Sequence, residues 1–535
     1  MRKCTTGVSV AMNFLLIMLL AAGLQMSASR ASPVGVPNLN QCELATDTSI
    51  IGPPTTLQLN CCLPIPSGSV VDFSFQTYQS AVKRVRMPAH KATADYIAKY
   101  TRAYEIMRSL PDHDPRSLSV QSKLHCAFCN GAYKQLGSNS AVVQVHFSWL
   151  FLPWHRWYLY FHERILASLL GDPTFSLVFW NWDDQRDGGN TMPAMFLNKG
   201  SSLYDQSRNA KHLPPNIVKL VPGSNGATSD IVKQNLNALY QDIVTSTTAE
   251  TFMGGAFRDG TNVSSSSLAT APLGGSMENG VHNSMHFWTG DPTQPLYQDM
   301  GTFLTAARDP IFYAHHSNVD RLWERWLNGM PGGQRALPSD PDFLNAEFYF
   351  YDEAGRIVKV FLRDALDNNK LGVSYPDVPA DDLWTHFSPT RITTGSAVLA
   401  ARANGVPEVG PAPDNGVITL HSAHPAIVKR FKNSKERTEV LVVQGLQVIR
   451  DTFVSLIVFV NLPDANSTSP TSSAEYVGTF NVIPVPGKPL YADVKFEIGD
   501  NLRRVGIENE SEVVVTLVVR GTQTITIQGL HIGYA

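Results

Sequence analysis

The chain has 535 residues, of which 43% are hydrophobic and 17% charged, and its formal net charge is −3. This length allows more than one hydrophobic core and predicts about two to four domains. The low charge, with no long run of either sign, argues against nucleic acid or an anionic membrane surface as the main partner.

The N-terminus has the pattern of a targeting segment. Arg2 and Lys3 precede an apolar run at 14–24, and small residues follow at 27–31. This order predicts a secretory signal peptide over 1–31, because the apolar run is too short to span a bilayer comfortably. We expect no membrane anchor, since no later run reaches transmembrane length. Three glycosylation sequons agree with a secreted route, at Asn262, Asn466 and Asn509.

Five cysteines remain beyond this segment: Cys42, Cys61, Cys62, Cys126 and Cys129. An odd number in an oxidising compartment predicts two disulfides and one cysteine with another fate. Neighbouring cysteines cannot bond to each other in relaxed geometry, so Cys61 and Cys62 must each reach elsewhere, one to Cys42 and one to Cys126. We expect residues 32–70 to form an extended arm held down by these bonds.

Helical spacing recurs in the first half of the chain. Residues 93–110 predict an amphipathic helix, and residues 125–131 are loop-like. In the aromatic run 142–166, a single helix would turn His146 and His155 to opposite sides, and Pro153 is expected to break it between them. His162 lies about 10 Å along the axis from His155, which predicts a packed neighbour rather than a shared ligand.

Two later segments carry histidines at helical spacing. After the mostly loop-like range 185–275, which holds a short helix at about 229–244, His282 and His286 stand at i, i+4 on one helical face. Asp309 is expected to cap a helix that begins at Pro310. In that helix either His315 or His316 can enter the buried stripe, although an isolated core histidine is the plainer alternative.

The second half of the chain changes its period. Residues 343–360 predict strands, and residues 376–428 form a proline-rich linker that we expect to be accessible to proteases. From 429 to 535 the apolar residues alternate and predict an antiparallel β-sandwich of about 110 residues. The range 32–375 would then be the catalytic domain.

The histidines fall into two sets of three: His125, His146 and His155, and His282, His286 and one of the adjacent pair at 315 and 316. Three neutral imidazoles bind copper or zinc and leave a position open for a small substrate. The 282–286 segment lacks the glutamate of the zinc-protease motif, so a hydrolytic zinc site is disfavoured. Two ions about 3.5–4 Å apart would hold an oxygen substrate between them.

Several of these segments resemble, in order, the plant polyphenol oxidase family of catechol oxidases and tyrosinases. They are His-Cys-Ala-Phe-Cys-Asn-Gly-Ala-Tyr (125–133), Ser-Trp-Leu-Phe-Leu-Pro-Trp-His-Arg-Trp (148–157), Phe-Trp-Asn-Trp-Asp (179–183), His-Asn-Ser-Met-His (282–286) and the stretch 308–323. The resemblance continues through 350–353 and 493–498. It implies a mainly α catalytic domain, with a four-helix bundle and long loops around a dicopper site, and a C-terminal all-β sandwich domain.

The resemblance also implies two coppers and the residues that hold them. His125, His146 and His155 would bind the first ion, and His282, His286 and His316 the second. Cys129 would form a thioether to His146, and the disulfides would be Cys42–Cys62 and Cys61–Cys126. Asp320 is expected to orient an imidazole.

The implied activity is oxidation of o-diphenols to o-quinones by dioxygen. Phe303 would overhang the second copper, and a water held by Glu278 and Asn283 would deprotonate monophenols for hydroxylation. The C-terminal domain would shield the site until a protease cuts near 385–425 or mild detergent opens it.

Some features depart from the family or leave alternatives open. Phe147 stands where the family usually has a small polar residue, and His162 where it usually has tyrosine, and both differences are expected to alter the surroundings of the ligands and thereby the substrate preference. The family is often plastid-targeted, whereas this N-terminus favours the vacuole, cell wall or extracellular space. Rival functions are haemocyanin-like oxygen binding, a specialised pathway oxidase of the aurone or lignan type, and a non-catalytic secreted binding protein.

Overall fold

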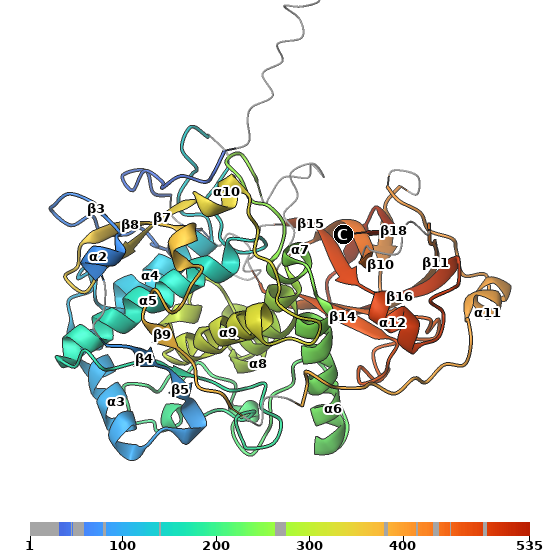
Figure 1. Ribbon diagram of the computed structural model, residues 1–535, viewed down its shortest axis with the longest axis horizontal. Helices are drawn as coiled ribbons and strands as arrows, with labels where there is room; N and C mark the ends of the chain where they lie inside the picture. Colours follow the sequence, from blue (N-terminus) through green and yellow to red (C-terminus); the bar gives the residue numbers. More distant parts are fainter. Residues whose placement is uncertain are drawn as a thin grey trace, which may run out of the picture.

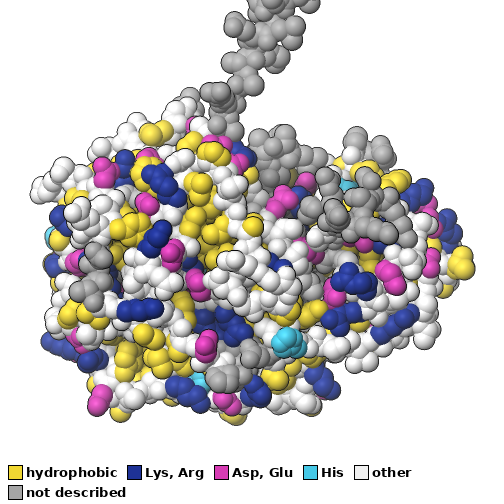
Figure 2. Space-filling view, viewed as in Figure 1, with side chains coloured by type: hydrophobic (Ala, Val, Ile, Leu, Met, Phe, Trp, Pro, Cys, Tyr) yellow, Lys and Arg dark blue, Asp and Glu magenta, His cyan; other side chains and the backbone are white. Residues whose placement is uncertain are grey.

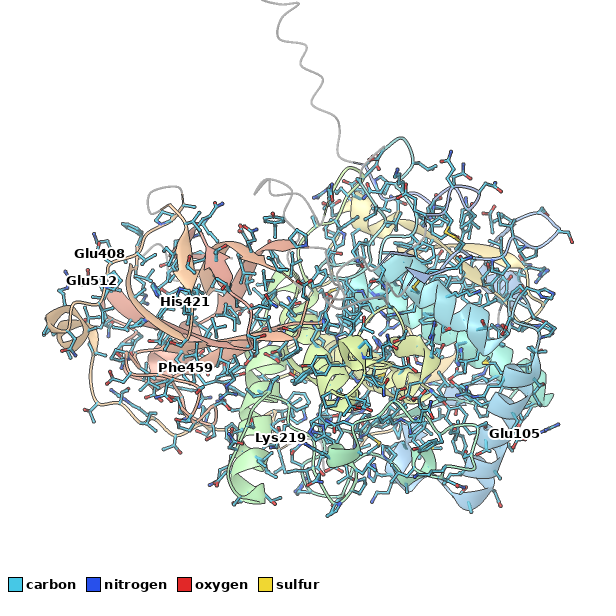
Figure 3. All side chains as sticks on the ribbon, turned by 180° about the vertical axis from the view of Figure 1, so that it is seen from behind. Glu105, Lys219, Glu408, His421, Phe459 and Glu512 are labelled. Carbon is cyan, nitrogen blue, oxygen red and sulfur yellow. A yellow bond between two sulfur atoms is a disulfide. The ribbon has the colours of Figure 1, made fainter. Side chains whose placement is uncertain are left out.

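The computed structural model joins a helical part to a C-terminal β part (Figure 1). It describes residues 32–43, 45–46, 58–78, 82–138, 141–262, 274–378, 383–412, 416–431, 438–449, 451–484 and 489–534. The predicted signal peptide lies outside these residues. Seen from behind, Glu105 lies at the helical end of the molecule, and Glu408 and Glu512 lie at the opposite end, in the β part (Figure 3).

The helical part is built on a few long helices and several short ones. The principal helices are α3 (Ala94–Ser109), α4 (Leu118–Cys129), α5 (Phe151–Leu170), α6 (Thr228–Leu239), the π-helical turn η6 (Glu278–His282) that runs into α8 (Asn283–Thr289), and α9 (Ile311–Asn328). Shorter helices are α2 (Phe75–Tyr78), α7 (Ala249–Met253), α10 (Pro341–Leu344), the π-helical η4 (Tyr240–Thr245) and the 3-10 turn η8 (Ala306–Arg308). Thr93 and Ser117 cap α3 and α4 through their hydroxyls, which fixes where both helices begin.

Short strands frame this helical core. β7 (Glu347–Tyr351) and β8 (Ile357–Phe361) form the predicted antiparallel pair, and β3 (Val71–Asp72) extends it in parallel. Four further strands pair in parallel as β4 (Arg84–Val85) with β9 (Val373–Ser374), and β5 (Met87–Pro88) with β6 (Val178–Phe179). The arm adds β1 (Ala45–Thr46) and β2 (Gln58–Leu59). Its disulfides are Cys42–Cys62 and Cys61–Cys126, as the resemblance implied.

The C-terminal part consists of two antiparallel sheets. One has the order β10 (Ile418–Leu420), β17 (Ile525–Ile527), β12 (Glu439–Val448) and β15 (Leu490–Glu497), with β18 (Gly529–Tyr534) also paired to β12. The other has the order β11 (Ala423–Lys429), β16 (Glu512–Arg520), β13 (Val454–Val460) and β14 (Tyr476–Val482). The short helix α12 (Gly499–Arg504) follows β15. The predicted fold class, a helical domain followed by a β domain, is confirmed.

Three local expectations are wrong. Residues 125–129 are helical, because the Ser117 cap starts α4 upstream of them. Pro153 does not separate two helices: residues 142–150 contain no regular helix, and Pro153 lies in the first turn of α5, where its missing N–H costs nothing. The expected linker contains α11 (Val398–Ala403) and the strands β10 and β11, whose apolar residues complete the sheets.

Charges are spread over the surface. Basic and acidic side chains are interspersed on the face drawn in Figure 2, in keeping with the small net charge. Among the described helices, none has both the length and the hydrophobicity that a membrane crossing requires.

Candidate metal centre

Two buried clusters of potential metal ligands lie in the middle of the helical part. One contains His125, Cys129, His146 and His155, and the other contains His282, His286, His315 and His316; within each cluster the ligand atoms lie within 4.8 Å of one another. The side chains come from α4, the loop before α5, α5, η6, α8 and α9, which meet at this point of the bundle (Figure 1). The structure therefore brings all six predicted ligands together.

The two clusters adjoin each other. The rings of His155 and His316, one from each cluster, stack at 4.2 Å between centroids. Within the second cluster, the Nε2 atoms of His286 and His316 are 3.4 Å apart. Two imidazole nitrogens that face each other in a dry site are the arrangement that a shared metal ion requires.

Backbone carbonyls fix the orientation of four of the imidazoles. Nδ1 of His125 donates to Phe303 O at 3.0 Å, Nδ1 of His155 to Phe151 O at 2.8 Å, Nδ1 of His282 to Glu278 O at 3.2 Å, and Nδ1 of His286 to Met300 O at 2.6 Å. Because Nδ1 carries the proton, Nε2 presents its lone pair, as in ligating histidines generally. The Nε2 atoms of His125, His155 and His282 are buried and have no hydrogen-bond partner among the described residues, so the site fits a metal ion.

Burial also keeps these imidazoles neutral. It lowers the pKa of His155 to about 3 and that of His286 to about 4. Burial and neighbouring histidines hold the pKa of His125, His282 and His316 well below the usual range. A neutral imidazole is the form that binds copper or zinc.

His315 differs from His316 in its hydrogen bond. The indole Nε1–H of Trp182 donates to Nδ1 of His315 at 3.1 Å. Nδ1 is then the acceptor, and the neutral ring must carry its proton on Nε2, which removes the lone pair that a metal would use. Sequence spacing could not distinguish His315 from His316 as a metal ligand. The hydrogen bond from Trp182 distinguishes them, because it leaves His315 without a free lone pair on Nε2.

Cys129 and His162 occupy different environments. Cys129 is a buried free cysteine whose sulfur belongs to the first cluster, and burial raises the pKa of its thiol well above the usual value. His162 lies outside both clusters, as expected: its Nε2 is 2.9 Å from the Tyr104 hydroxyl, and its ring stacks on Tyr313 at 3.5 Å.

Glu278 and Asn283 are buried but have separate partners. Both carboxylate oxygens of Glu278 accept the Phe147 N–H, at 2.8 and 2.9 Å, and burial raises the pKa of this carboxyl well above its usual range. Asn283 Nδ2 donates instead to the backbone O of Asn481 in β14, at 2.8 Å. No local pattern points to Asn481, which lies 198 residues from Asn283 in the C-terminal part.

Two further expectations need correction. The Phe303 ring stacks on His146 of the first cluster at 3.8 Å between centroids and lies 6.5 Å from His286, so it covers the first cluster rather than the second. Asp320 orients no imidazole in the structure. Its carboxylate accepts Arg156 Nε at 2.5 Å and pairs with Arg86 at 3.3 Å, so it is part of a buried ion-pair network.

Three family models match successive parts of the chain. The common central domain of tyrosinase matches residues 115–329, the polyphenol oxidase middle domain 338–390, and the chloroplastic polyphenol oxidase C-terminal domain 412–534. A latent-form polyphenol oxidase of Prunus armeniaca is 39% identical over 94% of this chain and 83% of its own length. A polyphenol oxidase of Vitis vinifera is 37% identical over 94% of this chain and 82% of its own length. The solved structure of a latent aurone synthase superposes with a TM-score of 0.83 at 34% identity, over 94% of this chain and 99% of that one.

The predicted secretory destination is wrong. Both curated relatives are named chloroplastic, which points to the plastid. Basic, apolar and small residues in succession mark a segment that is passed through a membrane, and their physical properties do not specify which membrane. With three family models in order and relatives matched over nearly the whole chain, this protein belongs to the plant polyphenol oxidase family.

Proposed function

We propose that this chain is a latent type-3 copper oxidase that uses dioxygen to oxidise o-diphenols to o-quinones. Two o-diphenols and one dioxygen give two o-quinones and two waters. The observation that carries the proposal is the pair of adjoining buried clusters whose Nε2 atoms converge while backbone carbonyls hold Nδ1. Bound there, a copper pair supplies the electron exchange between the phenol and dioxygen.

The ligand assignment follows the hydrogen bonds. His125, His146 and His155 would hold one copper, and His282, His286 and His316 the other. The Trp182 donor to His315 supports His316 as the sixth ligand. We further propose that Cys129 is joined to His146 by a thioether, which would hold the loop ligand in place, since both side chains belong to one cluster.

The protein environment prepares the site for an apolar aromatic substrate. Phe303 stacks on His146, and Phe151 lies 4.7 Å from His282, so aromatic rings separate the imidazoles from bulk water. A water held by Glu278 and Asn283 would serve as the base for a monophenol, and the Phe147 amide, which donates to both Glu278 oxygens, supports this role by orienting the carboxylate. Monophenol hydroxylation would then require Asn283 to be free of its partner in β14.

Contacts from the C-terminal part support latency. The backbone oxygen of Asn481 accepts a hydrogen bond from the Asn283 side chain. The Phe453 ring stacks on Phe287, the residue after His286, at 3.7 Å between centroids. β14 packs against η6 and α8, which carry two of the proposed ligands. We propose that cleavage within 385–425 by an activating protease releases this β domain and opens the site.

The test compares intact and trimmed protein, both loaded with copper. We expect sustained o-quinone formation from a catechol, with greater activity after limited proteolysis. Oxygen binding without turnover would favour the haemocyanin-like alternative, and fewer than two coppers per chain would contradict the ligand assignment. A matched monophenol measures the hydroxylation step separately.

Similarity to a latent aurone synthase supports a second candidate, an oxidase dedicated to one specialised product. The two functions share the copper site and differ in product. Incubation with a chalcone and identification of the product distinguishes them, because a general polyphenol oxidase would release the simple o-quinone rather than a cyclised aurone.

A further inference from the structure

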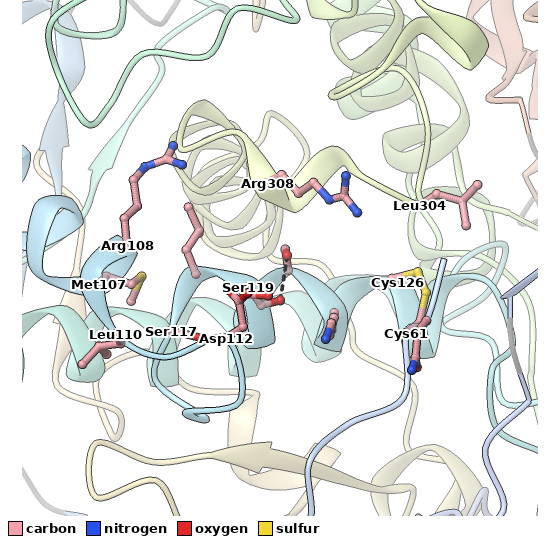
Figure 4. Close-up of a pocket in the computed structure, with 14 residues that line it drawn as sticks. Cys61, Met107, Arg108, Leu110, Asp112, Ser117, Ser119, Cys126, Leu304 and Arg308 are labelled. Atoms are coloured by element: carbon pink, nitrogen blue, oxygen red, sulfur yellow. Dashed lines mark hydrogen bonds between the residues drawn. A yellow bond between two sulfur atoms is a disulfide. The ribbon is translucent and has the colours of Figure 1, made fainter. Parts of the chain in front are cut away.

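We propose that a pocket beside the copper site binds a small organic dianion of the phosphate monoester class. The pocket has a volume of about 330 Å³ and lies between the end of α3, the first half of α4, the disulfide-tied arm and the turn η8. Figure 4 shows Arg108 and Arg308 on the same side of α4, with the Cys61–Cys126 disulfide at one end. Nothing in the proposed oxidation uses these residues.

The lining carries excess positive charge. Arg108, Lys123 and Arg308 come from three different segments, and Asp112 is the only carboxylate among the lining residues. None of the three cations forms an ion pair within 4.0 Å in the part of the chain that the structure describes. Arg108 Nε donates to Ser202 O at 2.9 Å, which fixes its guanidinium at the pocket rim.

Arg108 and Arg308 are exposed and Lys123 is half-buried, and Asp299, which does not line the pocket, is close enough for Arg308 to lower its pKa. Three cations gathered around one cavity repel each other unless an anion joins them. With Asp112 counted, the formal net charge of the lining is +2, which matches a dianion.

The shape and chemistry of the lining indicate the class of anion. Guanidinium groups bind phosphate oxygens through paired, directional N–H donors. The first turn of α4, which Ser117 caps, adds the partial positive charge of a helix N-terminus. Met107, Leu118 and Leu304 supply apolar wall, which suits the carbon part of an ester better than free phosphate.

The pocket also adjoins the elements that hold the copper ligands. Leu304 follows Phe303, whose carbonyl accepts the His125 Nδ1–H at 3.0 Å, and α4 carries His125 itself. An anion in the pocket would therefore contact the same loop and helix that orient His125, one of the proposed ligands.

The experiment is isothermal titration of the copper-loaded, full-length protein with phenyl phosphate and, separately, inorganic phosphate, at fixed ionic strength. We expect phenyl phosphate to bind more tightly than inorganic phosphate. Arg308→Ala and Lys123→Ala should each weaken its binding about tenfold, since each removes one charge-assisted contact. The control is Arg102→Ala on α3, which removes an exposed arginine paired with Glu105 and outside the pocket.

Three results would overturn the proposal. Equal affinity of the wild type and both pocket variants would place the anion elsewhere, including at the copper site. Inorganic phosphate binding as tightly as phenyl phosphate would reject the monoester class. Equal weakening by Arg102→Ala would show general electrostatics rather than a site. Near-ultraviolet circular dichroism verifies folding, and Arg308→Ala, at an exposed position, is the variant least expected to disturb it.

Discussion

A single carboxylate offers a direct test of how the C-terminal part is held on the catalytic part. Glu497, at the end of β15, is 5% exposed and accepts hydrogen bonds from Thr247 N at 2.7 Å, Thr248 N at 3.0 Å and Thr247 Oγ1 at 2.7 Å. The Thr251 hydroxyl donates to it as well. These donors belong to the start of α7, so one β-domain side chain satisfies a helix N-terminus of the catalytic part.

Glu497→Gln keeps the size of the side chain and removes its charge. The amide must turn an NH₂ group toward donors, so at least one contact is lost and the others lose their ionic character. Hydrogen bonds to charged groups contribute about 1.5–3 kcal/mol each, and we take about 3 kcal/mol for the whole change. At about 1.4 kcal/mol per factor of ten, the ratio of undocked to docked protein rises on the order of a hundredfold.

The assay is the initial rate of o-quinone formation from a catechol, before and after proteolysis within 385–425. We expect intact Glu497→Gln to be more active than the intact wild type. After trimming, the two preparations contain the same catalytic part and should have the same activity. The control is Glu250→Gln, which breaks the partly exposed pair with Lys495 at 2.7 Å and is expected to change little.

Wild-type activity in the intact variant, with normal trimmed activity, would refute the reasoning, because the β domain would then be held by other contacts. A variant that is active before trimming and gains nothing from it would indicate complete release by this one change.

Three further predictions concern the copper site and the stability of the fold. His316→Ala should reduce the copper content to about one ion per chain, whereas His315→Gln should keep both, as elemental analysis of the purified protein would show. After reduction and digestion, the peptide carrying Cys129 should stay joined to the peptide carrying His146, and separate peptides would rule out the thioether. Burial and neighbouring carboxylates raise the pKa of Asp205 from its ordinary 3.8 to about 7, so its contribution to stability is full below about pH 4 and is lost as pH rises to 7. Asp205→Asn should therefore raise the melting temperature at pH 7.5 and leave it nearly unchanged at pH 4, and an equal shift at both values would contradict this reasoning.

Local patterns predicted those elements that local forces decide. The helix at 94–109 follows from apolar spacing and a threonine cap, and the strands of the β part follow from alternation and turns. The predicted loop at His125 is wrong, because Ser117, eight residues upstream, caps a helix that continues through this short segment of mixed polarity. The prediction before Pro153 is also wrong, because a chain of aromatic residues is compatible with a helix or with a packed loop, and Phe147 takes a left-handed φ of 62° that only its surroundings stabilise.

The sequence by itself determined that six histidines on separate segments could form two metal sites and that a β domain follows them. Only the tertiary structure decided which of the two adjacent histidines offers a lone pair, because the deciding donor, Trp182, is 133 residues from His315. The tertiary structure also decided the hydrogen bonds between Asn283 and Asn481 and between the start of α7 and Glu497. These contacts join parts of the chain that no local pattern connects. Spacing along a helix sets the direction of a side chain, whereas its protonation and its partners depend on whatever the fold packs against it.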